Sequence, residues 1–233
     1  MSLWTIIRGL LGDDPVVPEP IVTPVRPTPA PPAPKPAPVP VPVPTPSPAP
    51  TAGTGWRYAL KPIFDLLGHT EGTDKRLGYN ESLAYGALTG GDKNLVGMTL
   101  LEIDSLQTQM LNHPKNKWNS SALGRYQIVR TTLRKLRKGF PQAALFDGDL
   151  QDVFAAKLLV GRGLLAWLAG TKSTVAFVNQ LAREWASIPT SSGNGYYSGQ
   201  RVGATVRQVT DALAQVKARM TGDVLADIKN LTT

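Results

Sequence analysis

The stretch of this sequence best suited to chemistry is His-Thr-Glu-Gly-Thr-Asp at residues 69–74, which carries the carboxylate of Glu71. Residues 56–68 before it have apolar side chains at helical spacing, and Gly68 and Gly72 are typical of the point where a helix stops. A glutamate at such a junction can be partly desolvated, which raises the pKa of its carboxyl group. Most glutamates at helix ends are solvated caps. A desolvated one can hold its proton near neutral pH and act as a general acid.

Further motifs follow this one in a fixed order along the chain. They are Leu-Gly-Tyr-Asn at 77–80, Ser-Ala-Leu-Gly-Arg-Tyr-Gln-Ile at 121–128, Glu-Trp-Ala-Ser-Ile-Pro at 184–189 and Gly-Tyr-Tyr-Ser-Gly-Gln at 195–200. Together, over about residues 56–216, the set resembles the bacteriophage-lambda-type endolysins, glycoside hydrolase family 104. The resemblance implies a lysozyme-like fold and an enzyme that cleaves bacterial peptidoglycan as a lytic transglycosylase.

The same resemblance gives roles to individual residues. It implies that Glu71 is the catalytic residue and that Ser121 contacts it. Gly124 is expected to let a sugar approach the backbone at the start of a helix, whereas Arg125 and Trp185 are expected to be structural. The residues expected to bind substrate are Tyr79, Asn80, Ser121, Tyr126, Gln127, Tyr197 and Gln200. A structural capping role is the alternative for each of them.

The number of carboxylates in the site bears on the reaction. Glycosidases ordinarily use two, and the candidates for the second are Asp74, Glu81 and Asp92. Asn80 stands where the lambda protein has an aspartate, which weakens a hydrolytic mechanism. A transglycosylase needs only Glu71, which would protonate the glycosidic oxygen and then act as base toward the C6 hydroxyl of the same muramic acid ring. That hydroxyl is tethered, so its effective concentration is high.

Three other functions remain open from the sequence. The first is a hydrolytic muramidase on the same fold, using Glu71 with Asp92 or Glu81. The second is a free endolysin, released in the infected cell, in place of an enzyme mounted on a virion. The third is a catalytically idle wall-binding module of the virion, which the intact Glu71 disfavours.

The pattern of apolar residues predicts the fold class. Helical periodicity covers residues 99–112, 124–138, 147–168, 173–186 and 203–220. Residues 78–94 mix glycine with Tyr, Leu and Thr, which favours short hairpin strands. We therefore expect an α+β, mainly helical, lysozyme-like domain with a small β-wing, and a cleft between the wing and the helices.

The N-terminal part differs from the rest in composition. Seventeen of the 21 prolines fall between Pro15 and Pro50, which predicts an extended proline-rich arm. The expected divisions are an amphipathic segment at 1–12, the arm at 13–53 and the catalytic domain at 54–233. Segment 1–12 is too short to span a membrane and lacks the cleavage site of a signal peptide. Docking onto a virion or tail protein, weak membrane contact and disorder are its possible states.

Charge and composition limit the classes of partner that we expect for this protein. The first 53 residues are neutral, so the rest carries the whole formal charge of +8, which suits the anionic bacterial envelope. Arg130, Arg134 and Arg137 share one helix face without interleaved aromatic residues, so nucleic acid is not expected as a partner.

Cysteine is absent and the two histidines lack ligand spacing, so neither a metal nor a cofactor is expected. No segment is expected to cross a membrane. The expected location is the virion, or the host cytoplasm with action in the periplasm.

Overall fold

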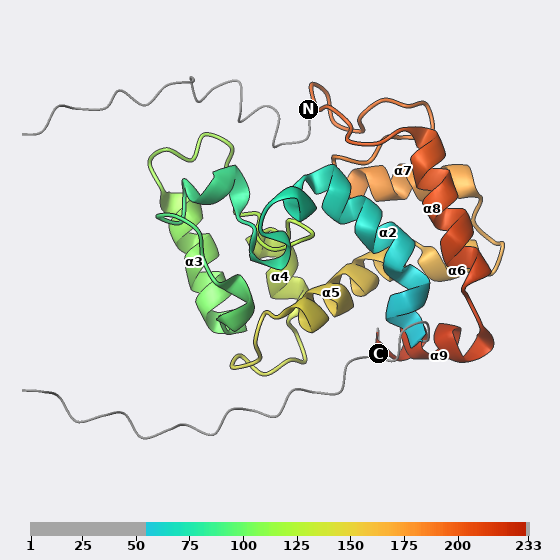
Figure 1. Cartoon of the computed structure of the whole chain (residues 1–233), viewed down its shortest axis with the longest axis horizontal. Helices are drawn as coiled ribbons and strands as arrows, with labels where there is room; N and C mark the ends of the chain where they lie inside the picture. The colour runs from blue at the N-terminus through green and yellow to red at the C-terminus, as the bar shows by residue number, and fades with distance from the viewer. Residues whose placement is uncertain (1–54, 232–233) are drawn as a thin grey trace, which may run out of the picture.

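The structure is a computed structural model that describes residues 55–231 (Figure 1). Helix α2 (Gly55–Glu71) crosses the middle of the domain. It contacts helices from the middle of the chain and from its C-terminal part. Helix α3 (Leu100–Asn112) lies at one end of the molecule in Figure 1, and α4 (Arg130–Leu136) packs against it on the side toward the middle. The remaining α-helices are α5 (Gly148–Gly161), α6 (Leu164–Leu168), α7 (Thr174–Glu184), α8 (Val206–Ala218) and α9 (Gly222–Asn230). The mainly helical expectation is confirmed, and the arrangement is consistent with a lysozyme-like domain.

Helix α2 forms because its apolar side chains fall on one face. Leu60, Ile63, Phe64 and Leu67 are all buried, and the helix packs most extensively against α8, with α9 and α5 also in contact. The helix continues past its predicted end and includes Glu71 as its last residue.

The small size of Gly68, which the sequence suggested as a stop signal, serves packing. A Cβ atom at Gly68 would lie 2.5 Å from the carboxylate oxygens of Asp74. Gly68 is therefore the point where the segment after Glu71 folds back against α2.

Polar caps fix where several helices begin. Thr99 and Glu102 form a capping box at the start of α3, and Thr205 and Gln208 form another at the start of α8. Ser173 caps α7 through the amide of Ala176. The predicted helices at 99–112, 173–186 and 203–220 are confirmed to within three residues at each end.

Two predicted helices differ from the structure. The stretch 147–168 is interrupted at Gly163, whose φ of 103° is compatible with glycine and separates α5 from α6. In the stretch 124–138 the helix begins only at Arg130, because residues 124–127 form a turn closed by paired Leu123 and Ile128. Helix α9 was not anticipated.

The predicted β-wing is wrong. Residues 78–94 contain the 3₁₀ turns η2 (Gly78–Asn80) and η3 (Leu83–Gly86), and η4 (Leu95–Gly97) follows them. The backbone has positive φ at Gly78 and Gly86, and also at Ala84 and Tyr85, whereas paired strands require negative φ throughout. Over residues 55–231 the β pairing consists of isolated bridges.

The predicted segments 1–12 and 13–53 lie outside the described residues. Among residues 55–231 no helix is long and apolar enough to cross a membrane.

Candidate active site

Glu71 lies at the C-terminal end of α2 with its side chain almost fully enclosed. Its residue is 7% exposed, and its Oε1 atom lies 2.6 Å from the hydroxyl oxygen of Ser187. The same hydroxyl is 3.0 Å from Thr70 Oγ1. The loop that carries Ser187 is held in place by the amide of Gly203, which donates to the Ser187 carbonyl at 2.7 Å.

The surroundings of Glu71 favour the protonated carboxyl group. Burial raises the pKa of Glu71 to about 7, because the charged form loses hydration that the protein does not replace in full. The hydrogen bond from Ser187 acts in the opposite direction, since it stabilises the carboxylate. A group with this pKa can give up and recover a proton near neutral pH, as general acid–base catalysis requires.

Glu71 lines a cavity of about 150 Å³ together with two predicted site residues, Gln127 and Gln200. The Oε1 atoms of both glutamines are buried and accept no hydrogen bond from residues 55–231. Gln127 also has a φ of 51°, a conformation that costs a non-glycine residue on the order of 1–3 kcal/mol. Unsatisfied acceptors and strained backbone beside a buried acid indicate a site built to receive hydrogen-bond donors from a ligand.

The serine that contacts Glu71 is Ser187, so the expected contact from Ser121 is wrong. Ser121 is buried, and its hydroxyl accepts a hydrogen bond from the amide of Arg130 at the first residue of α4. Ser121 thus positions the start of that helix. Its expected contact with substrate stays a prediction.

Three other predicted residues are engaged in the framework. The hydroxyls of Tyr79 and Tyr126 both donate to Asp152 Oδ1, at 2.7 and 2.6 Å. Burial and the neighbouring carboxylate raise the pKa of Tyr79 to about 12, so it remains a phenol. Asn80 accepts from the amide of Val96 and holds the loop between η2 and η4. Tyr79 and Asn80 do not line the cavity of Glu71, and their binding to substrate stays a prediction.

Arg125 has the structural role expected of it. Its guanidinium donates to both carboxylate oxygens of Asp74 at 2.7 Å and to Asp65 at 3.0 Å. It thereby ties the turn after Glu71 to the side of α2. Gly124 is required by protein packing, because a Cβ there would lie 2.2 Å from Gln151 Oε1. The expected sugar approach is not needed to explain this glycine.

The loop of residues 195–200 contributes at its two ends in different ways. Gln200 lines the cavity of Glu71, whereas Tyr197 is half-exposed and donates to the carbonyl of Arg183 at 2.9 Å. Tyr196 is also exposed, and the Arg183 guanidinium lies 5.3 Å from its ring centroid. The role of Tyr197 toward substrate stays a prediction.

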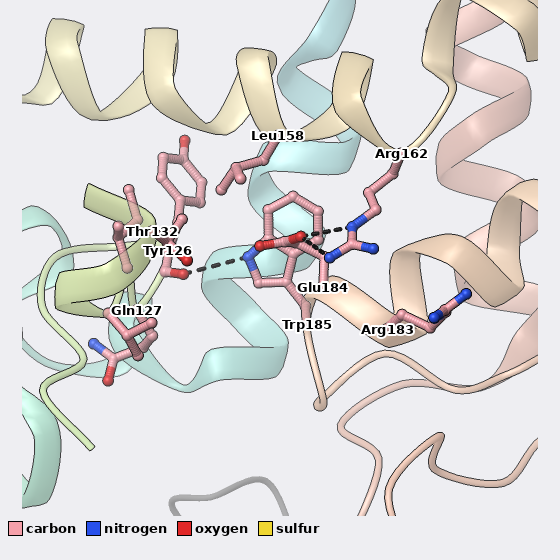
Figure 2. Close-up of a pocket in the computed structure, with 10 residues that line it drawn as sticks. Tyr126, Gln127, Thr132, Leu158, Arg162, Arg183, Glu184 and Trp185 are labelled. Atoms are coloured by element: carbon pink, nitrogen blue, oxygen red, sulfur yellow. Dashed lines mark hydrogen bonds and ion pairs between the residues drawn. The ribbon is translucent and has the colours of Figure 1, made fainter. Parts of the chain in front are cut away.

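Two residues at the site escaped the sequence analysis. One is Ser187, and the other is Glu184, which lines the cavity of Glu71 and a second cavity of about 240 Å³ beside it. Figure 2 shows Glu184 in this second cavity, ion-paired to Arg162 and next to Trp185. Trp185 is buried, as expected, and its indole donates to the carbonyl of Tyr126 at 3.3 Å. The motif at 184–189 pointed to this region without indicating either contact.

The carboxylates considered as partners of Glu71 lie in other networks. Glu81 is buried, with Oε1 accepting from Arg76 and from the amide of Ser82. Asp92 is exposed and receives two hydrogen bonds from Arg76. Neither residue, nor Asp74, lines the cavity of Glu71. Over residues 55–231 no three or more histidine, aspartate or glutamate side chains gather where they could hold a metal ion.

The hydrogen bond from Ser187 leads to a prediction about pH. Glu71 is protonated below pH 7, so kcat/KM should fall as the pH rises through about 7. Replacing Ser187 by alanine removes the interaction that lowers the pKa of Glu71. The alkaline limb of the pH–rate profile of Ser187→Ala should therefore move to higher pH.

Ser120→Ala is the matched control for this measurement. Ser120 lines the same cavity, and its hydroxyl has no hydrogen bond to Glu71. Its alkaline limb should coincide with that of the unmodified protein. An unmoved limb in Ser187→Ala, or an equal shift in both variants, would contradict the assigned contact.

Comparison with known proteins adds one finding to this geometry. A family model described as Endolysin matches residues 61–220, which include Glu71, both glutamines and Ser187. No curated protein sequence and no solved structure matches the chain. Since the match covers more than half of the sequence, the chain belongs to the endolysin family.

Proposed function

We propose that this protein is a lytic transglycosylase of the lambda type, which cleaves the β-1,4 bond between N-acetylmuramic acid and N-acetylglucosamine in peptidoglycan. Membership of the endolysin family implies a phage enzyme that degrades the bacterial cell wall. The observation that carries the finer proposal is the buried acid Glu71, whose pKa is raised to about 7 beside a cavity with free acceptors.

In this mechanism Glu71 acts twice. It first donates its proton to the glycosidic oxygen, so that the bond to the anomeric carbon breaks and the leaving sugar departs as an alcohol. The resulting carboxylate then takes the proton of the C6 hydroxyl of the muramic acid, whose oxygen attacks the anomeric carbon. The product is a 1,6-anhydro ring, and Glu71 is again protonated. A pKa near 7 suits both steps, since neither protonation state is strongly disfavoured at neutral pH.

One observation favours hydrolysis as a second candidate. Glu184 is a carboxylate that lines the same cavity as Glu71, so it could activate a water molecule. However, Arg162 binds its Oε2 atom through Nε at 2.6 Å and also through Nη2, so this oxygen is already engaged. A carboxylate held in this way is a weaker candidate for a base than an unpaired one.

Product analysis separates the two reactions. Transglycosylation should give muropeptides that end in 1,6-anhydromuramic acid, lighter by one water than the hydrolysis products and without a reducing end. The measurement is mass spectrometry of purified peptidoglycan digested by the full chain, with a known hydrolytic muramidase as the reference. Reducing muramic acid ends as the main product would establish the hydrolase in its place.

We also propose that segment 1–12 and the proline-rich residues 13–53 mount the enzyme on the virion. The support is the sequence alone: proline stiffens an arm at low entropic cost, and the apolar tip with Trp4 and Ile7 suits a groove on a tail protein. Purified virions should then contain the protein by mass spectrometry and show its activity in a zymogram. Absence from particles, with accumulation late in infection, would support a free endolysin.

A further inference from the structure

The second cavity of about 240 Å³ continues the one at Glu71. The two share four lining residues, which are Gln127, Val129, Glu184 and Trp185. A substrate held at Glu71 therefore has room for an adjoining group in the second cavity. The residues that line the second cavity should indicate the chemistry of that group.

The distinctive feature of the second cavity is an ion pair. Arg162 is the C-cap of α5 and Glu184 is the last residue of α7, and their side chains meet across the cavity wall in Figure 2. Both Arg162 contacts are to Glu184 Oε2. Among the described residues, Glu184 Oε1 therefore accepts no hydrogen bond and Arg162 Nη1 donates none. The pair presents one negatively charged acceptor and one positively charged donor.

The pair is also partly removed from water. The exposed fraction of the side chain is 31% for Arg162 and 14% for Glu184. Desolvating two charges costs free energy that their attraction need not recover, so such a pair is weak evidence for a stabilising role. Glu184 lines both cavities and Arg162 lines the second, which points to recognition of a ligand with charges of its own.

We propose that this second cavity binds the stem peptide of peptidoglycan, with Arg162 and Glu184 as the residues that recognise its charges. The sugars of intact peptidoglycan are neutral, because the lactyl carboxyl group of each muramic acid is amide-linked to its stem peptide. The peptide attached to the muramic acid carries carboxylates and amide or amine donors, which match the free donor of Arg162 and the free acceptor of Glu184. This inference rests on the proposed function, because it requires a muramic acid at Glu71.

The experiment compares intact peptidoglycan with glycan strands stripped of their stems by an amidase. The unmodified enzyme should cleave intact strands with the higher kcat/KM. Glu184→Gln keeps the shape and one acceptor but removes the charge, and should lower kcat/KM on intact strands about tenfold, a typical loss for one charge-assisted contact. On stripped strands the loss should be smaller, so that the ratio of the two kcat/KM values falls, because the lactyl carboxylate that the amidase leaves carries no donor for Glu184.

The matched control is Asp104→Asn, which breaks an arginine–carboxylate pair between α3 and α4 whose residues line neither cavity. Asp104 receives hydrogen bonds from Arg134 at 2.6 and 2.9 Å, so the variant measures what the loss of such a pair costs by itself. It should change kcat/KM by the same factor on both substrates. A second readout is titration with free stem tetrapeptide, which should shift the NMR resonance of the Trp185 indole N–H in the unmodified protein and less in Glu184→Gln.

Two results would overturn the inference in distinguishable ways. If Glu184→Gln loses the same activity on intact and stripped strands, the cavity takes part in sugar binding or catalysis, and the stem assignment fails while the proposed function stands. If the unmodified enzyme cleaves neither substrate, the proposed function itself fails and the stem assignment falls with it.

Discussion

Glu71→Gln should abolish the cleavage of peptidoglycan while leaving the protein folded. Glutamine keeps the shape of the side chain and can still accept from Ser187, but it has no proton to deliver at neutral pH. Loss of a general acid–base group lowers rates by about 10²–10⁴-fold, and here one group serves both steps, so we expect a loss at or above the upper part of that range. Release of muropeptides from purified cell walls measures it.

The same variant has an expected effect on stability that tests the environment of Glu71. The pKa of Glu71 is about 7 in the folded protein and ordinary, near 4.5, in the unfolded chain. Below pH 4.5 both states are protonated and no penalty exists. As the pH rises from 4.5 to 7, ionisation of the unfolded state lowers the free energy of unfolding by up to about 3 kcal/mol. Glutamine does not ionise, so Glu71→Gln should be more stable than the unmodified protein at pH 8.

The controls for Glu71→Gln come from this pH dependence. At pH 4 the two proteins should unfold at similar urea concentrations, because the penalty is then absent. Appreciable lysis of cell walls by folded Glu71→Gln would remove Glu71 from the mechanism. Equal stability of the two proteins at pH 4 and pH 8 would show that the carboxyl group is not desolvated.

The sequence indicated the helices best where local signals agreed. Thr99 and Glu102 form the capping box that their spacing suggests, and α3 starts directly after Thr99. The reading failed at residues 78–94, where Ala84 and Tyr85 adopt positive φ. Residue type alone does not predict a left-handed backbone at alanine or tyrosine, because this conformation is imposed there by tertiary contacts. Glycine, tyrosine and leucine in this stretch therefore suggested strands that do not form.

The candidate site shows the same division between local and distant information. Glu71 could be proposed from its motif, and Gln127 and Gln200 from the resemblance, because each lies within a recognisable stretch. Ser187 contacts a residue 116 positions away, and no spacing rule connects them. Nothing in the sequence marked Glu184 as a partner of Arg162, and only the fold brings the end of α5 to it. Pairings between distant elements decide which serine and which carboxylate belong to the site.

The largest effect on stability is expected at Arg125, whose side chain is 13% exposed. Besides Asp74 and Asp65, its guanidinium lies 5.4 Å from the ring centroid of Tyr79 and 5.7 Å from that of Tyr126. Arg125→Met retains much of the apolar contact but leaves Asp74 without its partner, close against Gly68 of α2. Removing one member of such a pair costs about 3–5 kcal/mol when it is buried, and the partial exposure of Asp74 places the expectation near 3 kcal/mol.

Urea denaturation at pH 7 measures this loss in the free energy of unfolding, and Arg207→Met is the matched control. Arg207 pairs with Asp211 on α8, but its side chain is 89% exposed, so its loss should change the stability by less than about 1 kcal/mol. Arg125→Lys should fall between the two, because an ammonium keeps the charge but cannot bind both oxygens of Asp74 as the guanidinium does. If Arg125→Met unfolds at the same urea concentration as Arg207→Met, the turn after Glu71 is held by other contacts. The most direct alternative is then Thr73, whose hydroxyl donates to the Arg125 carbonyl at 2.8 Å and would survive the substitution.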